Sequence, residues 1–276
     1  MMKTLIKNKQ ALVGIILIGL MIIIAILAPR IVPQDPYAQN LFNRYQAPEG
    51  IGGEHILGTD NLGRDIFSRL IMGSRVSLLV GFIAVGISLL IGLILGAIAG
   101  YVGGYLDEVI MRLMDVILAF PAILLAIFIV AVLGPGMVNA MFAIAIVRIP
   151  TMARITRGQV LGLKEEEFVE AARAMGATNF SILFKHILIN GFAPMMVMAT
   201  LGMGTAIVTE AGLSFLGLGA QPPMISWGRM LASGREALRS APHLTTWSGI
   251  AIVLSVLGFN LLGDGLRDIF DPKLNR

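Results

Sequence analysis

Long apolar runs separated by short polar stretches dominate this chain. A transmembrane helix needs about 20 predominantly apolar residues to cross the hydrocarbon core of a bilayer. We interpret six runs as membrane-spanning, and they cover residues 11–29, 76–100, 113–133, 138–155, 192–218 and 250–262. The pattern therefore predicts an all-α polytopic membrane protein with six transmembrane helices.

Glycine and proline mark special positions in the second and third helices. Three glycines recur at every fourth position of the second helix and form a groove for close contact with another helix; they are Gly92, Gly96 and Gly100. Residues 101–112 carry two adjacent glycines and several charges, which predict an inner turn. Pro121 predicts a kink in the third helix.

The fourth helix has the weakest apolar pattern. Its uninterrupted apolar part, residues 138–149, is too short to cross a bilayer, and Arg148 and Pro150 interrupt its inner end. Long arginine side chains can extend from a membrane helix to the headgroups. We therefore expect Arg148 and Arg154 to reach the cytoplasmic headgroups, so that the helix continues to about Ile155.

Residues 30–75 form the longest polar interval between two spans, and we expect an ordered external loop or small subdomain there. Several large residues in it are expected to be buried, namely Tyr37, Leu41, Phe42, Tyr45 and Leu57. A short helix over 65–75 would place Ile66, Leu70 and Gly73 on one face.

The basic residues orient the chain. Lys3, Lys7 and Lys9 precede the first apolar run, which predicts a cytoplasmic N-terminus. With six spans the C-terminus is cytoplasmic too. Thirteen of the 21 Lys and Arg residues then lie inside and eight outside, in agreement with the positive-inside rule.

The longest inner polar interval, residues 165–190, predicts two short helices. Four residues of the first helix form an apolar stripe, namely Phe168, Ala171, Ala172 and Met175. Glutamates at 165–167 suit its first turn, Gly176 predicts a left-handed C-cap, and Thr178 or Asn179 can cap the next helix. By itself, this pattern is typical of an amphipathic connector on the membrane surface.

Glu170-Ala171-Ala172, followed by Gly176 and then Ile187-Leu188, resembles the EAA loop of ATP-binding-cassette (ABC) importer permeases. The resemblance implies a coupling helix that sits in a groove of a cytoplasmic ATPase. The residues implied to mediate this coupling are Phe168, Glu170, Ala171, Ala172, Met175 and Gly176. Where the family usually has a proline near the end of the motif, this chain has Ile189.

Three further segments resemble the dipeptide, oligopeptide and nickel branch of these permeases, namely residues 55–78, 214–231 and 258–272. The resemblance implies a type I ABC importer permease fold of the second-permease type in the bacterial inner membrane. It also implies a heterodimer with a related permease, two cytoplasmic ATP-binding subunits and an extracytoplasmic substrate-binding protein.

On this reading the chain divides into four parts. Residues 1–29 are a cytoplasmic segment and the first helix, and residues 30–75 are the extracytoplasmic loop. Residues 76–265 form a five-helix permease domain that includes the cytoplasmic coupling loop 158–190, and residues 266–276 form a cytoplasmic tail.

The residue inventory predicts a transport subunit rather than an enzyme. The chain has no cysteine, and its histidines, His55, His186 and His243, fall in different loops, so we predict no metal site and no catalytic site. A GxxxxGK[ST] phosphate loop is absent, so we expect no cofactor in this chain and ATP-Mg on partner subunits. The scattered basic residues form no nucleic-acid stripe.

Polar groups inside the spans mark a possible pathway or helix interface. Glu210 lies in an apolar stretch on one face with Gly202 and Ala206, which suits either the pathway or a close-packed neighbour. A second group, Asn260, Asp264, Arg267 and Asp268, predicts a structural polar cluster at the inner end of the last helix.

The sequence leaves an alternative cargo and an alternative transport mechanism to consider. The methionines at 195, 196, 198 and 203 suit flexible core packing better than a soft-metal site, but nickel or a metal chelate is an alternative cargo to peptides. An autonomous channel or ion-coupled carrier usually needs several intramembrane charges or internal repeats, and the sequence argues against both.

Overall fold

The computed structural model describes residues 8–270, and its regular elements are helices apart from one isolated bridge between Thr59 and Asp65. Five helices are long and apolar enough to cross a membrane. They are α2 (Lys9–Ile31), α3 (Ile66–Val102), α6 (Met137–Leu163), α10 (Phe192–Phe215) and α12 (His243–Phe270). The bent pair of α4 (Gly104–Leu118) and α5 (Ala122–Leu133) is a sixth candidate span. The predicted all-α membrane fold is confirmed.

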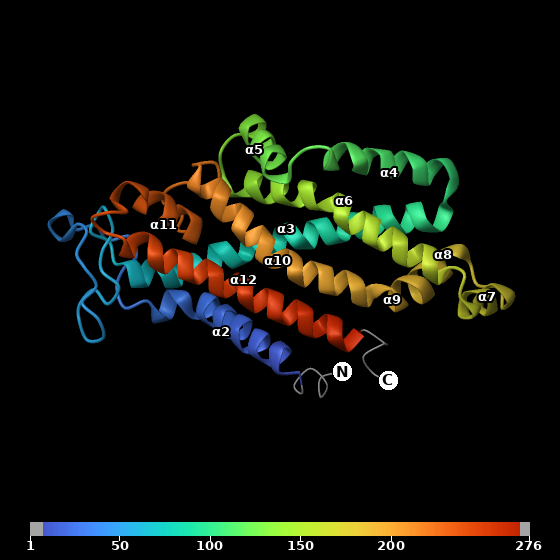
Figure 1. The fold of residues 1–276 in the computed structure, drawn as a ribbon, viewed down its shortest axis with the longest axis horizontal. Helices are drawn as coiled ribbons and strands as arrows, with labels where there is room; N and C mark the ends of the chain where they lie inside the picture. Colours follow the sequence, from blue (N-terminus) through green and yellow to red (C-terminus); the bar gives the residue numbers. More distant parts are fainter. Residues whose placement is uncertain (1–7, 271–276) are drawn as a thin grey trace.

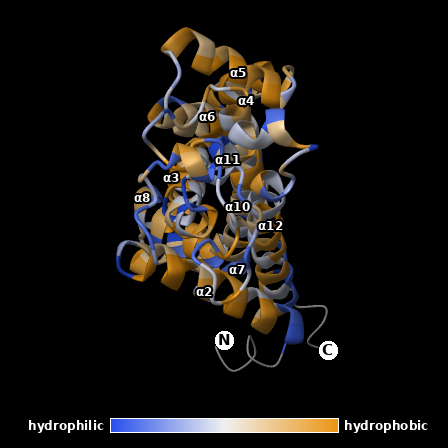
Figure 2. Cartoon of the chain, turned by 90° about the vertical axis from the view of Figure 1, so that its left-hand side faces the viewer, coloured by the Kyte–Doolittle hydropathy of each residue, from blue (hydrophilic) through white to orange (hydrophobic). Residues whose placement is uncertain are grey.

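The long helices lie side by side along the long axis of the molecule (Figure 1). In this bundle α12 packs against both α2 and α10, and α3 packs against α6 and α10. The loop of residues 32–65 and the short helix α11 (Trp227–Gly234) lie at one end, which we call the loop end. The helix α7 (Glu167–Ala174) lies at the other, the α7 end. Figure 2 shows apolar residues over much of the outside of the bundle, as a membrane-embedded protein requires.

Both described ends of the chain lie toward the α7 end (Figure 1). The Nδ2 atom of Asn8 donates a hydrogen bond to Oδ2 of Asp268 at 2.9 Å, and this bond joins the start of α2 to the last turn of α12. Residues 1–7 and 271–276, with the predicted lysines and the end of the predicted tail, fall outside the described residues.

The predicted glycine groove on α3 is confirmed, and its partner is α6. A Cβ added at Gly96 would lie 2.2 Å from the carbonyl oxygen of Ala153, and one at Gly92 would lie 2.4 Å from Cβ of Met152. Such distances leave no space for a side chain. The two backbones therefore approach closely because glycine stands at the contact.

The second helix begins about ten residues earlier than predicted. The separate short helix expected over residues 65–75 is instead the start of α3, capped by Asp65, whose carboxylate accepts the N–H of Ser68 at 2.7 Å. Tertiary contacts extend the helix here: the indole Nε1 of Trp227 donates to the carbonyl of Leu70 at 3.0 Å. The N–H of Trp227 also donates to Oγ of Ser77 at 3.1 Å, and Arg69 pairs with Asp60 of the loop at 3.4 Å, so these polar residues have partners within a continuous helix.

The third span is also different from the prediction. The predicted glycine break forms at Gly103, where φ is +70°, but the rest of residues 101–112 is helical, since α4 starts at Gly104. The predicted kink near Pro121 is a bend of 90° between α4 and α5. Pro121 stands at the N-cap of α5, where its missing N–H costs nothing. On α6, by contrast, the helix continues through Pro150 to Leu163, beyond the predicted end near Ile155.

The external loop is ordered by polar contacts, not by burial of its large side chains. Phe42 is 99% exposed, and Leu41, Tyr37 and Tyr45 are exposed too, so the expected burial is wrong for these residues. Instead, buried Asp60 pairs with Arg64 at 2.7 Å and with Arg69 at 3.4 Å.

A second polar contact in this loop involves Glu49. The backbone N–H of His55 donates to its carboxylate at 3.0 Å and lowers the pKa of Glu49 below its usual value. The His55 ring in turn contacts Asp65 at 3.1 Å, next to the start of α3. These bonds tie the loop to the helix that follows it.

The outer segment before the last span contains a helix that was not predicted, and the last span is longer than predicted. The outer segment 219–245 contains α11, and α12 starts at His243, seven residues before the predicted apolar run. Close packing explains the placement of α11, because a Cβ at Gly228 would lie 2.5 Å from Cα of Ala211 on α10.

Candidate coupling helix and membrane cavity

The turn that follows α7 has the predicted geometry. Gly176 has a φ of +84°, in the left-handed region that favours glycine. The N–H of Ala177 donates to the carbonyl of Ala172, and that of Gly176 to the carbonyl of Arg173, both at 3.0 Å. Thr178 caps the next helix through the N–H of Ser181 at 3.3 Å. Both caps were predicted from residue type. They end α7 and start the next helix within a few residues, so the chain turns between the two helices.

The apolar stripe predicted on α7 is divided between two faces. Val169 and Ala172 are buried in a small core with Ile182 and Ile187, so Ala172 does not face outward as predicted. Phe168, Ala171 and Met175 are exposed at spacings of three and four residues; we call these three residues the α7 ridge. Met175 is 81% exposed and Phe168 is 37% exposed.

Glu170 and Gly176 are also exposed and lie beside the α7 ridge. The predicted stripe did not include Val169, which is buried together with Ala172. The two residues are three positions apart, and this helical spacing places them on the same buried face of α7. The short helix therefore shows one apolar face to its own chain and another to the outside.

The segment after Thr178 returns to the bundle without a break at Ile189. It consists of α8 (Asn179–Ser181), the π-helical turn η2 (Ile182–Ile187) and α9 (Leu188–Asn190), and only Gly191 separates it from α10. Since no proline stands here, the N–H groups remain available for helical bonds. The hydroxyl of Tyr101 donates to Oδ1 of Asn179 at 2.9 Å and ties this segment to the end of α3.

Ion pairs connect α4 to α6 toward the α7 end. Arg157 donates from two nitrogens to the two carboxylate oxygens of Asp107, each at 2.6 Å, in a bidentate arrangement. Arg154 pairs with Asp115 at 2.5 Å, with both side chains about half exposed. Arg154 is thus held by α4, which was not predicted.

Arg148 does not reach the headgroups as predicted. Its side chain turns toward α10, where Nη1 donates to Oγ1 of Thr205 at 2.5 Å. Gly202 provides the space, because a Cβ added there would lie 2.0 Å from Nη2 of Arg148. The prediction failed because the sequence does not show that a glycine 54 positions later faces this side chain.

Arg148 lines a cavity of about 400 Å³ between α5, α6 and α10, which we call the α6–α10 cavity. Its polar lining consists of the guanidinium and three threonine hydroxyls, and Met198 and Gly202 also line it; the threonines are Thr151, Thr205 and Thr209. Gly202, predicted to mark a pathway or interface, lies in this cavity.

Glu210 and Ala206 do not line the α6–α10 cavity, although they share a predicted face with Gly202. Both are fully buried. The hydroxyl of Ser214 donates to Oε1 of Glu210 at 2.6 Å and accepts from the N–H of Ala220 at 3.0 Å. Glu210 therefore stabilises the turn that follows α10, and the geometry supports a structural role.

The polar cluster predicted on α12 does not form as expected. Asn260 is exposed, and its Oδ1 lies 3.6 Å from the position that a Cβ of Gly204 would take. Asp268 binds Asn8 instead, and within residues 8–270 no ion pair joins Arg267 to Asp264 or Asp268.

The methionines of α10 point into different surroundings. Met195 is buried and accepts a hydrogen bond from Thr156 at 3.3 Å, whereas Met203 packs near Gly81 on α3 and Met198 lines the α6–α10 cavity. This separation supports the interpretation of these residues as packing elements.

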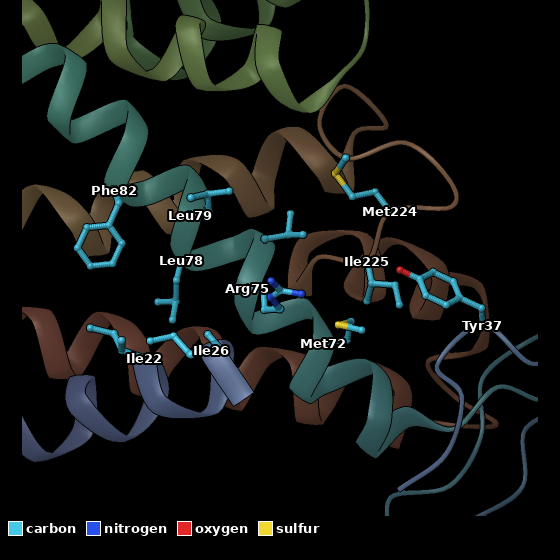
Figure 3. Close-up of a pocket in the computed structure, with 12 residues that line it drawn as sticks. Ile22, Ile26, Tyr37, Met72, Arg75, Leu78, Leu79, Phe82, Met224 and Ile225 are labelled. Carbon is cyan, nitrogen blue, oxygen red and sulfur yellow. The ribbon is translucent and has the colours of Figure 1, made fainter. Parts of the chain in front are cut away.

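A second cavity, of about 550 Å³, opens between α2 and α3 (Figure 3). Figure 3 shows Ile22 and Ile26 of α2 facing Leu78 and Phe82 of α3, so the lining is largely apolar. Arg75 of α3 and Tyr37 of the external loop add a guanidinium and a hydroxyl to this lining.

Six candidate spans, a short exposed helix at one end and a cavity between the spans are the features of a multi-pass membrane protein. The family model of the binding-protein-dependent transport system inner membrane component matches residues 92–276. A second model, the N-terminal TM domain of oligopeptide transport permease C, matches residues 1–48. The chain belongs to this family of inner-membrane components and is an ABC importer permease of the peptide and nickel branch.

Individual relatives agree with this assignment. The dipeptide transport system permease protein DppC of Alkalihalophilus pseudofirmus is 53% identical over 272 residues, which cover 99% of this chain and 88% of that protein. The glutathione transport system permease protein GsiD of Pectobacterium atrosepticum is 47% identical over 268 residues, 97% of this chain and 88% of that protein.

The fold also resembles a solved structure, the MetNI methionine ABC transporter in inward facing conformations. The match has a TM-score of 0.62 at 19% identity and covers 75% of this chain and 98% of the matched chain. At this identity the likeness concerns the fold alone.

Proposed function

We propose that this chain is the permease subunit of an ATP-driven importer of di- and oligopeptides. The names of the similar relatives, which specify dipeptide and glutathione transport, support a peptide cargo. The partners are a related permease, two cytoplasmic ATP-binding subunits that carry ATP-Mg, and an extracytoplasmic substrate-binding protein.

The observation that carries the proposal is the exposed α7 ridge. Phe168 and Ala171 of the eight-residue helix α7 and Met175 at its C-cap form an apolar surface at the end of a membrane bundle. Exposed apolar ridges of this kind fit into grooves of partner proteins. We assign the ATPase contact to this ridge together with Glu170 and Gly176, while Ala172 supports the helix from inside.

The geometry of the α7 end suits the transmission of motion. Val169 and Ala172 anchor α7 to the η2 turn, and the bond from Tyr101 to Asn179 anchors the adjoining segment to α3. When the ATPases close, a helix held in this way moves as a rigid body with the spans attached to it. The spans then open alternately to the two sides of the membrane.

The position of the chain ends relative to the α7 end gives the proposed topology. If α7 contacts cytoplasmic ATPases, both termini are cytoplasmic, since the described chain ends lie toward the α7 end. The loop end, with residues 32–65 and α11, then faces the substrate-binding protein. The coupling loop is residues 158–190 within the permease domain 76–265.

Uptake measurements test the cargo. Cells that lack only this chain, and complemented cells, are compared for uptake of a labelled dipeptide and of labelled nickel. We expect loss of dipeptide uptake alone, restored by the complementing chain. Loss of nickel uptake alone would assign the metal as cargo and contradict the peptide proposal.

Two variants test the coupling assignment. Glu170→Lys reverses a charge beside the ridge, and Gly176→Trp introduces a large residue where φ is +84°, so both are expected to abolish transport while the chain still inserts into the membrane. Glu165→Lys is the matched control, because Glu165 is exposed but precedes α7. Normal uptake by the Glu170 and Gly176 variants at normal protein level would remove the coupling assignment.

A further inference from the structure

Arg148 differs from the other two described arginines of α6 in having no carboxylate partner. Arg154 pairs with Asp115 and Arg157 pairs with Asp107. Within residues 8–270, no carboxylate lies within ion-pair distance of Arg148, and its buried Nε atom makes no hydrogen bond. A guanidinium between membrane helices is costly unless an anion compensates its charge.

The hydrogen-bonding groups around Arg148 leave donors without acceptors. A guanidinium offers five N–H donors and no acceptor. One of them is used by Thr205, whose own hydroxyl donates to the carbonyl of Gly202 at 3.0 Å. The hydroxyl of Thr209 likewise donates to the carbonyl of Thr205 at 2.8 Å. Within residues 8–270 the guanidinium hydrogen-bonds to Thr205 alone, so its other terminal N–H donors are available to an acceptor that enters the α6–α10 cavity.

A second source of positive potential lies at the same cavity. Ala122, the first residue of α5, lines it, and no side chain caps this end of the twelve-residue helix. Helix N-termini carry partial positive charge and free N–H groups. Together with the planar fork of Arg148, this arrangement suits a carboxylate, which an arginine binds through two parallel hydrogen bonds.

We propose that Arg148 binds a carboxylate of the peptide cargo as it passes through the α6–α10 cavity. The inference rests on the proposed peptide function, because a peptide carries a carboxylate at its C-terminus. Arg148 then selects for anionic groups inside the membrane, independently of the substrate-binding protein. The same charge disfavours a free divalent metal ion as cargo.

Thiol labelling tests the site directly, since the chain has no cysteine. In the complete transporter, Thr209→Cys places a single thiol of this chain in the cavity. An anionic methanethiosulfonate should label it at least about tenfold faster with Arg148 present than in an Arg148→Gln background, and a cationic reagent should show the opposite preference. Arg148→Lys should retain much of the preference because it keeps the charge.

A dipeptide provides the second readout. It should slow the labelling of Thr209→Cys when Arg148 is present and should not do so in the Arg148→Gln background. Arg154→Gln is the control, because Arg154 lies on the same helix but pairs with Asp115 and does not line the cavity. This control should leave both the charge preference and the protection unchanged.

The outcomes separate the two proposals. Equal labelling rates with and without Arg148, or no labelling, would overturn the carboxylate site; equal rates are also expected if a carboxylate of the partner permease neutralises Arg148. A charge preference without any protection by dipeptide would leave an anion site but overturn its peptide assignment. Dipeptide uptake by the unaltered transporter decides the proposed function separately.

Discussion

Truncation of Met175 is the sharpest test of the α7 ridge. Full burial of a methionine side chain contributes about 1.5–3 kcal/mol. Because 81% of Met175 is exposed in the free chain, a partner that covers it gains about 1–2 kcal/mol. Met175→Ala should therefore weaken ATPase binding about tenfold. It should leave the Tm of the isolated permease unchanged, since the side chain stabilises little within this chain.

Val169→Ala is the matched control on the same helix. Val169 is fully buried, so its truncation removes contacts within the chain and should cost about 1–2 kcal/mol of local stability. Purified permease pairs carrying each variant are titrated with the ATPase, and ATPase stimulation by the loaded binding protein is measured in proteoliposomes. Unchanged affinity and stimulation for Met175→Ala would refute the assignment of the ridge as the ATPase contact.

Two further predictions concern the bundle. Gly96→Ala should destabilise the isolated chain by about 1–3 kcal/mol because its Cβ meets the backbone of α6. Gly86→Ala on the same helix should not, because a Cβ there would meet no atom of another element within 4 Å, and thermal unfolding in detergent compares the two variants. Asp107→Asn should lower the free energy of unfolding by about 1–2 kcal/mol, because it breaks the bidentate pair with Arg157. Asp115→Asn should lower it by less than about 0.5 kcal/mol, because the pair of Asp115 with Arg154 is half exposed. Equal Tm values within either comparison would contradict the packing or the ion-pair argument.

The coupling segment shows how far residue types predict local structure. The turn at Gly176 and the cap at Thr178 follow from backbone preferences of single residues, and both form as expected. The orientation of α7 about its own axis does not follow from them. Phe168 and Val169 are adjacent apolar residues, and only the packing of Val169 against Ile182 and Ile187 determines which of the two faces outward.

The sequence by itself determined the class of the protein, the approximate places of its spans and the short helix that carries the coupling motif, because apolar run length and turn chemistry are local properties of the chain. Only the tertiary structure decided the 90° bend before α5, the early start of α3 and the direction of Arg148. The sequence places a kink at Pro121 but gives no angle for it, and the other two features involve residues distant in sequence, Trp227 for α3 and Gly202 for Arg148. Local patterns cannot encode such contacts, since they form only when separate helices pack together.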